Sequence, residues 1–291
     1  MRESVSTEVP TWFSEAVATP YEIREIEVDG AVVRSRCWGQ PGRGIVLVHG
    51  SAAHAGWWDH IAPLLAQNWR VVAIDLSGHG SSSWRSEGYQ MATWSKELID
   101  QAGPAGIVGP PYVVGHSQGG YIAMLAGVEF PNQLAGVITI DTYLPPSVGL
   151  ARYTPSPVAP TRYYQTREEA IERFKLLPPD PYILPYALRH VVDQSLAHDQ
   201  PGWFWKYDPN SRRIDRMITD EVVVRTHDQL ALLRGEFGIM GELPDGDITV
   251  AGRQVPTVCL PQTGHHAILD DPLAVVREVE RILALWEGAA N

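Results

Sequence analysis

Short apolar runs and helical patterns alternate from residue 23 to about residue 141, and this alternation constrains the fold more than any other feature. The apolar runs are rich in β-branched residues and too short for typical helices: IVLVH (45–49), RVVAID (70–75), YVVG (112–115) and GVITID (136–141). Strands that are buried on both faces of a parallel sheet have this composition. Helical patterns lie between the runs, at residues 57–67, 91–101 and 118–130. Alternating strands and helices predict an α/β fold, with a mostly parallel sheet flanked by helices.

Segments on either side of this region extend the predicted sheet. Residues 23–28 and 31–38 read as a hairpin joined at Asp29-Gly30, which is a strong signal for a two-residue turn. The strand pattern returns at residues 229–234 and 255–260, and residues 271–286 form a closing amphipathic helix. In such sheets ligands bind at the carboxyl ends of the strands, so we expect the chemistry there.

The texture of the sequence changes between residues 145 and 225. Residues 145–160 are proline-rich, and residues 161–225 hold helix-like pieces and a cluster of aromatic residues. The strand pattern resumes only after this stretch. We therefore expect one core domain built from residues 1–144 and 226–291, with residues 145–225 inserted as a helical lid.

Composition disfavours several classes of function. The formal net charge of −11 would repel nucleic acids and anionic membrane surfaces. Cys37 and Cys259 stand alone, and the histidines lack a metal-ligand pattern, so we expect neither a disulfide nor a metal. The glycine-rich turns match no nucleotide motif, so we expect no cofactor. Without an apolar leader or a run of about 18 apolar residues, the chain is expected to be cytoplasmic.

The strongest motif is GHSQG at residues 115–119, which follows a strand and opens a helix. A G-x-S-x-G motif in this context predicts a strained turn that exposes the hydroxyl of Ser117 at the top of the sheet. The backbone N–H of Gln118 lies at the helix N-terminus, where it can stabilise a developing oxyanion. Ser117 is therefore our candidate nucleophile.

Two further motifs supply partners for this serine. HGS at residues 49–51 ends another strand, and the backbone N–H of Ser51 is our candidate for the second oxyanion donor. GHH at residues 264–266 follows the last strand. A serine hydroxyl needs an adjacent base, and histidine can act as one near neutral pH. We expect His265 to be that base, with His266 as the alternative.

Together the segments HGSAAHAGWW, DLSGHGSSS, GHSQGG and GHHAILDDP resemble the α/β-hydrolase superfamily, in its esterase and C–C hydrolase branch. The resemblance spans residues 23 to 286 and implies the α/β-hydrolase fold. It places the family's nucleophile on Ser117, its histidine on His265 and its oxyanion donors on Ser51 and Gln118.

The sequence departs from the family pattern at the third member of the catalytic triad. The family usually carries its acid in a G-E-x-D-like stretch after the penultimate strand, where this chain has Gly238 in the acid position. Some relatives carry the acid at the end of the strand that follows the nucleophile helix, and Asp141 stands there. We expect Asp141 to orient the histidine, ahead of Glu236, with Asp245 and Asp247 further behind.

The predicted function is that of a serine hydrolase that cleaves a small or medium carboxylic ester or lactone, with water as co-substrate. Aromatic residues of the lid and of the loop after the third strand suggest an apolar substrate group, bound by Trp58, Trp203 and Trp205. A C–C bond hydrolase with the same triad is the first alternative. A ligand-binding receptor of the same fold, without turnover, is the second. Neither the natural substrate nor the oligomeric state follows from the sequence.

Overall fold

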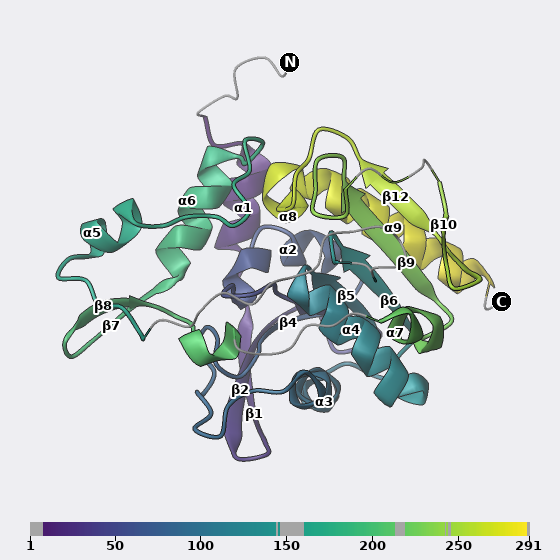
Figure 1. The fold of residues 1–291 in the computed structure, drawn as a ribbon, viewed down its shortest axis with the longest axis horizontal. Coiled ribbons are helices and arrows are strands. Elements are labelled where there is room, and N and C mark those ends of the chain that lie inside the picture. The colour runs from purple at the N-terminus through teal and green to yellow at the C-terminus, as the bar shows by residue number, and fades with distance from the viewer. Residues whose placement is uncertain are drawn as a thin grey trace.

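The core of the protein is an eight-stranded sheet, seen in a computed structural model that describes residues 8–143, 145, 160–212, 219–241, 243 and 246–289 (Figure 1). The strand order is β1-β2-β4-β3-β5-β6-β9-β12. The strands are β1 (Glu22–Val28), β2 (Ala31–Trp38), β3 (Gly44–Val48), β4 (Arg70–Asp75), β5 (Tyr112–His116), β6 (Gly136–Ile140), β9 (Leu230–Gly235) and β12 (Thr257–Leu260). Strands β4 to β12 in this order are parallel, and β1 and β2 form an antiparallel edge. The sequence prediction of a mostly parallel sheet is confirmed.

The order of the strands reverses around β3. The chain passes from β3 to β4 on one side and then returns to β5 on the other side of β3. Such a reversal opens a crevice outside the carboxyl ends of the two strands that flank it. The loops after β3 and β5, which carry Ser51 and Ser117, therefore meet at one place.

Helices cover both faces of the sheet and bury a separate apolar core on each (Figure 1). On one face lie α3 (Met91–Ala102), α4 (Gln118–Glu129) and α7 (Asp220–Arg225). On the other lie α1 (Thr11–Ala18), α2 (Ala62–Leu65), α8 (Ala267–Asp270) and α9 (Pro272–Ala289). Trp94 is fully buried in the first core and Trp58 in the second.

One predicted helix is wrong. Instead of a single helix over residues 57–67, the chain forms a 3-10 turn, η1 (Ala55–Trp58), and then the short α2. Pro63 has no N–H to donate to the carbonyl four residues earlier, so a continuous helix is disfavoured there. The carboxylate of Asp59, between the two elements, instead binds Arg36 at 2.6 Å and His190 at 2.9 Å.

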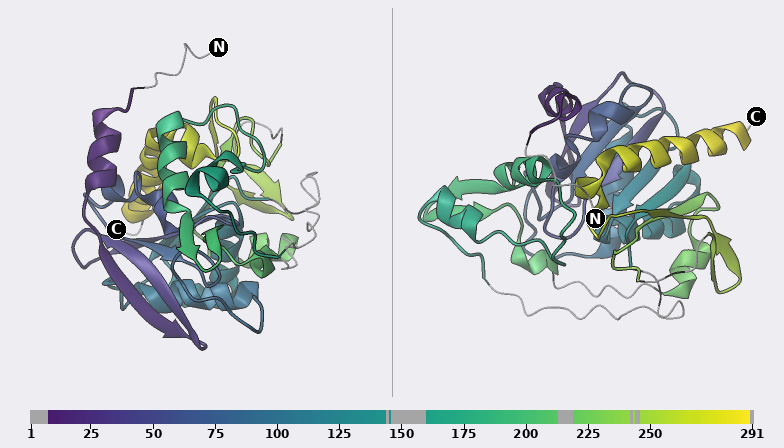
Figure 2. Two further views of the ribbon diagram at one scale, coloured as in Figure 1. Left: turned by 90° about the vertical axis from the view of Figure 1, so that its left-hand side faces the viewer. Right: turned by 90° about the horizontal axis from the view of Figure 1, so that it is seen from above.

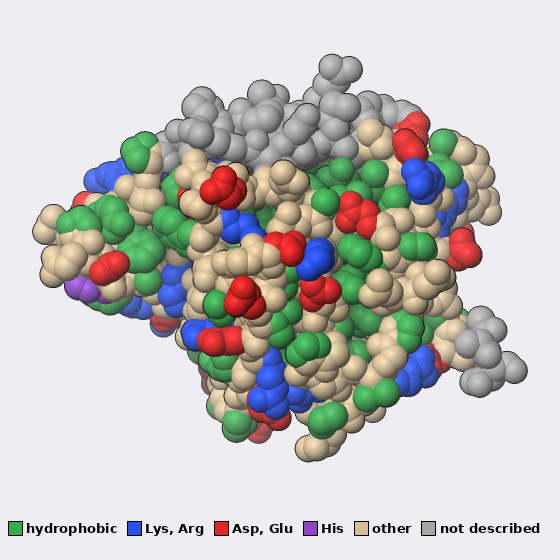
Figure 3. Space-filling model, turned by 90° about the horizontal axis from the view of Figure 1, so that it is seen from below, with side chains coloured by type: hydrophobic (Ala, Val, Ile, Leu, Met, Phe, Trp, Pro, Cys, Tyr) green, Lys and Arg blue, Asp and Glu red, His purple; other side chains and the backbone are tan. Residues whose placement is uncertain are grey.

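The inserted segment projects from the sheet on the side opposite the C-terminal end of α9 (Figure 2). Its described part holds α5 (Arg167–Glu172), α6 (Pro185–Gln194), β7 (Leu196–Asp199), β8 (Gly202–Trp205) and the 3-10 turn η4 (Pro209–Arg212). Figure 3 shows this projection with hydrophobic side chains on its surface. Within the segment, Tyr163 and Phe204 contact each other with ring centroids 5.6 Å apart. Residues 146–159, most of the proline-rich stretch, lie outside the described residues.

The end of the expected lid packs on the core. Helix α7 lies against α4, and Val223 is fully buried in the same apolar core as the α4 side chains. The sequence analysis did not foresee a small hairpin, β10 (Ile248–Val250) with β11 (Arg253–Val255), which comes between β9 and β12 along the chain. In the fold, β10 packs near α7 and β11 near β9. None of the described helices is long and apolar enough to span a bilayer.

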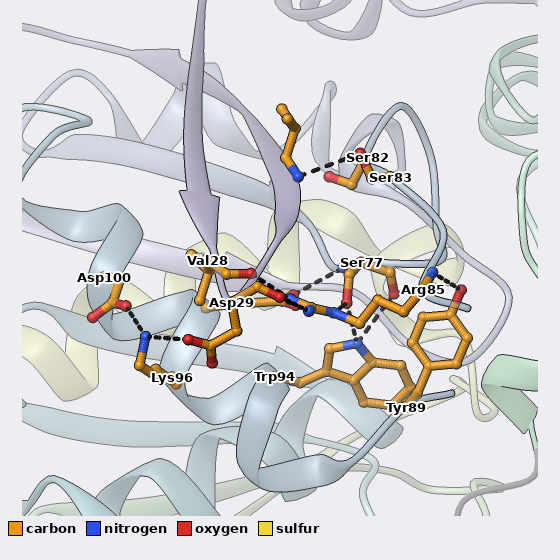
Figure 4. Close-up of polar contacts among 12 residues, drawn as sticks. Val28, Asp29, Ser77, Ser82, Ser83, Arg85, Tyr89, Trp94, Lys96 and Asp100 are labelled. Atoms are coloured by element: carbon orange, nitrogen blue, oxygen red, sulfur yellow. Dashed lines mark hydrogen bonds and ion pairs between the residues drawn. The ribbon is translucent and has the colours of Figure 1, made fainter. Parts of the chain in front are cut away.

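Arg85 anchors the loop after β4 to the β1–β2 hairpin (Figure 4). Its guanidinium donates to the carbonyls of Val28 and Asp29, each at 2.8 Å, and to the hydroxyl of Ser77 at 2.8 Å. It also pairs at 2.7 Å with Glu97, whose side chain is completely buried. Hydrogen bonds to charged groups are among the stronger ones in proteins, so this cluster holds the loop beside the sheet edge.

Candidate active site

Ser117 sits on a strained turn between β5 and α4. Its backbone has φ +53° and ψ −119°, a conformation that residues other than glycine rarely adopt. Gly119 makes the turn possible, because a Cβ there would lie 2.3 Å from the carbonyl oxygen of Val48. The turn is fixed from below by the Ser117 N–H, which donates to Ile140 at 2.8 Å. The result is a half-buried serine at the carboxyl end of the central strands.

His265 follows β12 and is paired with Asp141. Its Nδ1 lies 2.7 Å from Oδ2 of Asp141, and the aspartate side chain is fully buried. The same carboxylate accepts the backbone N–H groups of Gly235 at 3.2 Å and Ile239 at 2.8 Å. These donors orient the carboxylate and stabilise its charge away from water.

Glycine at position 238 makes room for this carboxylate. A Cβ built on Gly238 would lie 2.0 Å from Oδ1 of Asp141. Asp141 itself has φ +43°, a left-handed conformation that aspartate tolerates better than most residues. The carboxylate of Asp141 can therefore occupy this place only because position 238, where the family usually carries its acid, is a glycine.

Of the other acidic candidates, the two that the structure describes, Glu236 and Asp247, make no hydrogen bond to the histidine. Glu236 is exposed and accepts the backbone N–H of Gln262 at 2.8 Å. Asp247 is exposed in the loop before β10, and Asp245 lies outside the described residues. Among the described carboxylates, only Asp141 is hydrogen-bonded to His265.

Two other histidines, His116 and His266, lie next to His265. The ring centroid of His116 lies 4.9 Å from that of His265, and the ring of His266 lies 4.8 Å from it. Burial lowers the pKa of His116 well below its usual value and that of His266 to about 3. Such a low pKa makes His266 a poor base at neutral pH. One ring nitrogen from each of the three histidines lies within 4.8 Å of the others, so geometrically they could hold a metal ion.

The two expected oxyanion donors flank the serine. Gln118 is the first residue of α4, so its N–H has no partner within the helix. The loop after β3 passes close to the serine, because a Cβ built on Gly50 would lie 3.3 Å from Cβ of Ser117. Ser51, the next residue, lines the same cavity as Ser117.

A cavity of about 690 Å³ connects these residues to the inserted segment. Ser51, Ser117 and His265 line it on the core side, and residues between 160 and 212 line it on the other side. The size suits a small or medium ligand.

Of the three tryptophans expected to bind the substrate, only Trp205 lines the cavity. Trp205 lines the cavity, as does Trp57, with Phe174 beside Trp205 at a ring-centroid distance of 5.2 Å. Trp58 does not: it is 0% exposed and packs in the core beneath the sheet, because neighbouring residues of η1 point in different directions. Trp203 is not part of the lining either. Its ring packs against His198 on the β7–β8 hairpin.

Sequence reasoning missed the charged part of the lining. Arg162, Arg173, Lys175, Lys206 and Arg212 all face the cavity. They are scattered over 51 positions of the sequence, from 162 to 212, in no recognisable motif. Only the folded insertion brings them together.

Comparisons with known proteins identify the family and support the fold. The family model of the alpha/beta hydrolase family matches residues 45–279. The chain is 27% identical over 271 residues to a serine hydrolase-like protein from Danio rerio, covering 84% of this chain and 82% of that protein. It is 23% identical over 272 residues to Esterase Rv0045c from Mycobacterium tuberculosis, covering 89% of each. Among solved structures, E-2-(acetamidomethylene)succinate hydrolase superposes with a TM-score of 0.71 at 16% identity, covering 91% of this chain and 100% of that one. The chain belongs to the alpha/beta hydrolase family.

Proposed function

We propose that this hydrolase cleaves a carboxylic ester or lactone through an acyl-enzyme formed on Ser117. The hydroxyl of Ser117 attacks the substrate carbonyl while His265 takes its proton. The N–H groups of Ser51 and Gln118 hold the oxyanion of the tetrahedral intermediate. When the intermediate collapses, His265 gives its proton to the leaving alcohol. Water, deprotonated by the same histidine, then releases the acid and regenerates the serine.

The contact between His265 and Asp141 is the observation that carries this proposal. Because Nδ1 faces a carboxylate at 2.7 Å, the ring proton is held there and Nε2 is left as the acceptor. The buried aspartate also stabilises the imidazolium that forms when Ser117 loses its proton. His265 and Ser117 line one cavity, so the base and the nucleophile share access to a substrate.

The residues that line the cavity support the proposal that the substrate is an ester with an apolar part. Trp57, Phe174 and Trp205 supply aromatic surface to the lining, and apolar walls are typical of small-molecule sites.

We further propose that residues 145–225 act as the lid over this site. Described residues of this segment line the cavity opposite Ser117, where a lid can exclude water and select substrates.

The experiment is to treat the protein with a fluorophosphonate and to assay it with a panel of p-nitrophenyl esters, lactones and β-diketones. We expect the probe to label Ser117, as mapped by peptide mass, and to abolish ester hydrolysis in parallel. Ser117→Ala should lose about 10³-fold or more in kcat, because the triad acts as a unit. Ser86→Ala, at an exposed serine on the loop after β4, is the matched control and should keep wild-type rates.

Other results would overturn the proposal in distinct ways. Turnover of β-diketones without turnover of esters or lactones would make the protein a C–C bond hydrolase with the same machinery. Binding of ligands with neither labelling nor turnover would make it a receptor. Labelling at another residue, with loss of activity, would move the nucleophile away from Ser117.

A further inference from the structure

The side of the cavity that the insertion forms is positively charged, although the chain as a whole is acidic. The sequence has 34 Asp and Glu against 23 Lys and Arg. Yet five of the described lining residues are Lys or Arg, and none is Asp or Glu: Arg162, Arg173, Lys175, Lys206 and Arg212. A concave site lined by one sign of charge concentrates ligands of the opposite sign.

These five side chains make no ion pair with any described residue. Outside the cavity, the partly buried Arg36 and Arg85 form close ion pairs, with Asp59 at 2.6 Å and with Glu97 at 2.7 Å. Of the cavity cations, Lys206 and Arg212 are likewise half-buried, and Arg162, Arg173 and Lys175 are exposed. In the cavity, Arg162 packs instead over the ring of Tyr164, with 5.1 Å between the guanidinium carbon and the ring centroid. Cations left without acidic partners in a cavity are available to a ligand.

Lys206 is the cation most firmly built into the site. It is half-buried, and burial lowers the pKa of its ammonium group. Its backbone is fixed on both sides: its N–H donates to Ser195 at 2.9 Å, and its carbonyl accepts from Gly80 at 2.8 Å. The hydroxyl of Ser195 lies 2.8 Å from Nε2 of His54, which is three residues beyond Ser51. The wall that carries Lys206 thus adjoins the loop that supplies the expected oxyanion donor.

Lys206 forms no direct ion pair with a described residue, although the charge of the buried Asp75 raises the pKa of its ammonium group and offsets part of the effect of burial. A partly desolvated ammonium group that is not directly paired costs free energy, and an anionic ligand would recover part of that cost. We propose that the substrate of this hydrolase is an amphiphilic ester that carries a carboxylate or a phosphate, which Lys206 binds within the field of the other four cations. The apolar part of this ester packs on Trp57, Phe174 and Trp205 while its carbonyl faces Ser117. This inference rests on the proposed function and names its substrate class.

Matched pairs of esters test the proposal. The first pair, mono-p-nitrophenyl adipate and p-nitrophenyl hexanoate, differs by a carboxylate at the end of the acyl chain. The second pair, butyryl esters of glycerol 3-phosphate and of glycerol, places a phosphate on the alcohol side. We expect wild-type kcat/KM to favour the anionic member of at least one pair about tenfold or more, with the preference falling as salt rises. The pair that shows the preference identifies the anion and the side on which it is carried.

Substitutions at Lys206 then assign the effect. Lys206→Met keeps an unbranched side chain only one atom shorter and should lower the anionic-to-neutral ratio of kcat/KM about tenfold, mainly through KM. Lys206→Arg should retain much of the ratio. Lys96→Met, on α3 and outside the cavity, removes the same charge and should keep the wild-type ratio. If the Lys206 variants fold poorly, Arg162→Met tests the same effect and should also lower the anionic-to-neutral ratio of kcat/KM.

Two outcomes would overturn the inference. One is a wild-type enzyme that favours the neutral member of both pairs or treats the members alike. The other is a Lys206→Met variant that retains the wild-type ratio. Because the neutral esters would still be hydrolysed in either case, such results leave the proposed function standing. Failure to hydrolyse any ester, together with no fluorophosphonate labelling, would instead count against the proposed function.

Discussion

Asp141 and Gly238 share one small space at the carboxyl ends of β6 and β9: a Cβ on Gly238 would lie 2.0 Å from the aspartate's Oδ1. The aspartate accepts the N–H of Gly235, the last residue of β9, and that of Ile239 in the loop that follows, and it contacts His265 from there. Its carboxylate thus occupies the place that the side chain of any larger residue at position 238 would need. A substitution at either position therefore affects the other.

The acid of the proposed triad is tested by a matched pair of amide substitutions. Asp141→Asn should keep the fold yet lower kcat by up to about 10⁴-fold, because an amide at this place favours the wrong tautomer of His265. Glu236→Gln removes a charge from a nearby exposed side chain and should change kcat little. Steady-state kinetics with one ester, alongside circular dichroism for folding, measures both. A reversal of the two effects would assign the acid to Glu236.

Moving the carboxylate tests the shared space directly. Gly238→Ala should lower activity, because its methyl group collides with Asp141 and pushes the carboxylate away from His265. The double variant Asp141→Ala with Gly238→Asp removes that collision and supplies a carboxylate from the neighbouring strand end. It should recover part of the activity that Asp141→Ala alone loses. If Gly238→Ala is as active as wild type, the packing argument is wrong.

The sequence predicts the regular part of the fold well, because buried strands and their turns are local features. The expected bounds of β2 and β4 agree with the structure, and α3 and α4 end within one residue of expectation. From the sequence, the two leading candidates for the triad acid are Asp141 and Glu236, at the ends of two different strands. The choice between them depends on how the residues at the ends of β6 and β9 pack, which is not a local feature of the sequence. The cation-lined cavity could not be predicted, since Arg162, Lys206 and Arg212 meet only through the tertiary structure. Likewise, sequence cannot tell which of Trp57 and Trp58 faces the cavity.

The aromatic wall of the cavity is tested with two neighbouring tryptophans on β8. Trp205 lines the cavity, whereas Trp203 is not among the lining residues and packs against His198 of β7. Trp205→Ala should change the ranking of esters with different acyl chains, because it removes apolar surface that the substrate contacts. Trp203→Ala, the matched control, should leave the ranking unchanged even if it lowers the melting temperature. Equal changes in ranking from both variants would show that the hairpin acts as a whole.

The buried histidine His60 should make stability depend on pH. Its ring lies in the core beside Phe13, its Nε2 is 2.7 Å from the carbonyl oxygen of Ile268, and burial lowers its pKa to about 4. In the unfolded chain the ordinary value is near 6.5, so between pH 6.5 and about 4 the unfolded state binds a proton that the folded state does not. Stability from the neutral ring is therefore fully present above pH 6.5 and is lost as the pH falls through this window. At pH 4.5 the loss should be about 2–3 kcal/mol.

Because carboxylates titrate in the same range, the difference between two proteins measures the histidine. His60→Gln keeps an N–H donor for the carbonyl of Ile268 and removes the titrating group. Urea unfolding at pH 7.5 and 4.5 gives the free energy of unfolding of each protein. We expect the variant to be less stable than wild type at pH 7.5, because the ring no longer fills its site, and to lose about 2–3 kcal/mol less than wild type on acidification. Parallel losses in the two proteins would mean that His60 is protonated in the folded state, or reaches water, well above pH 4.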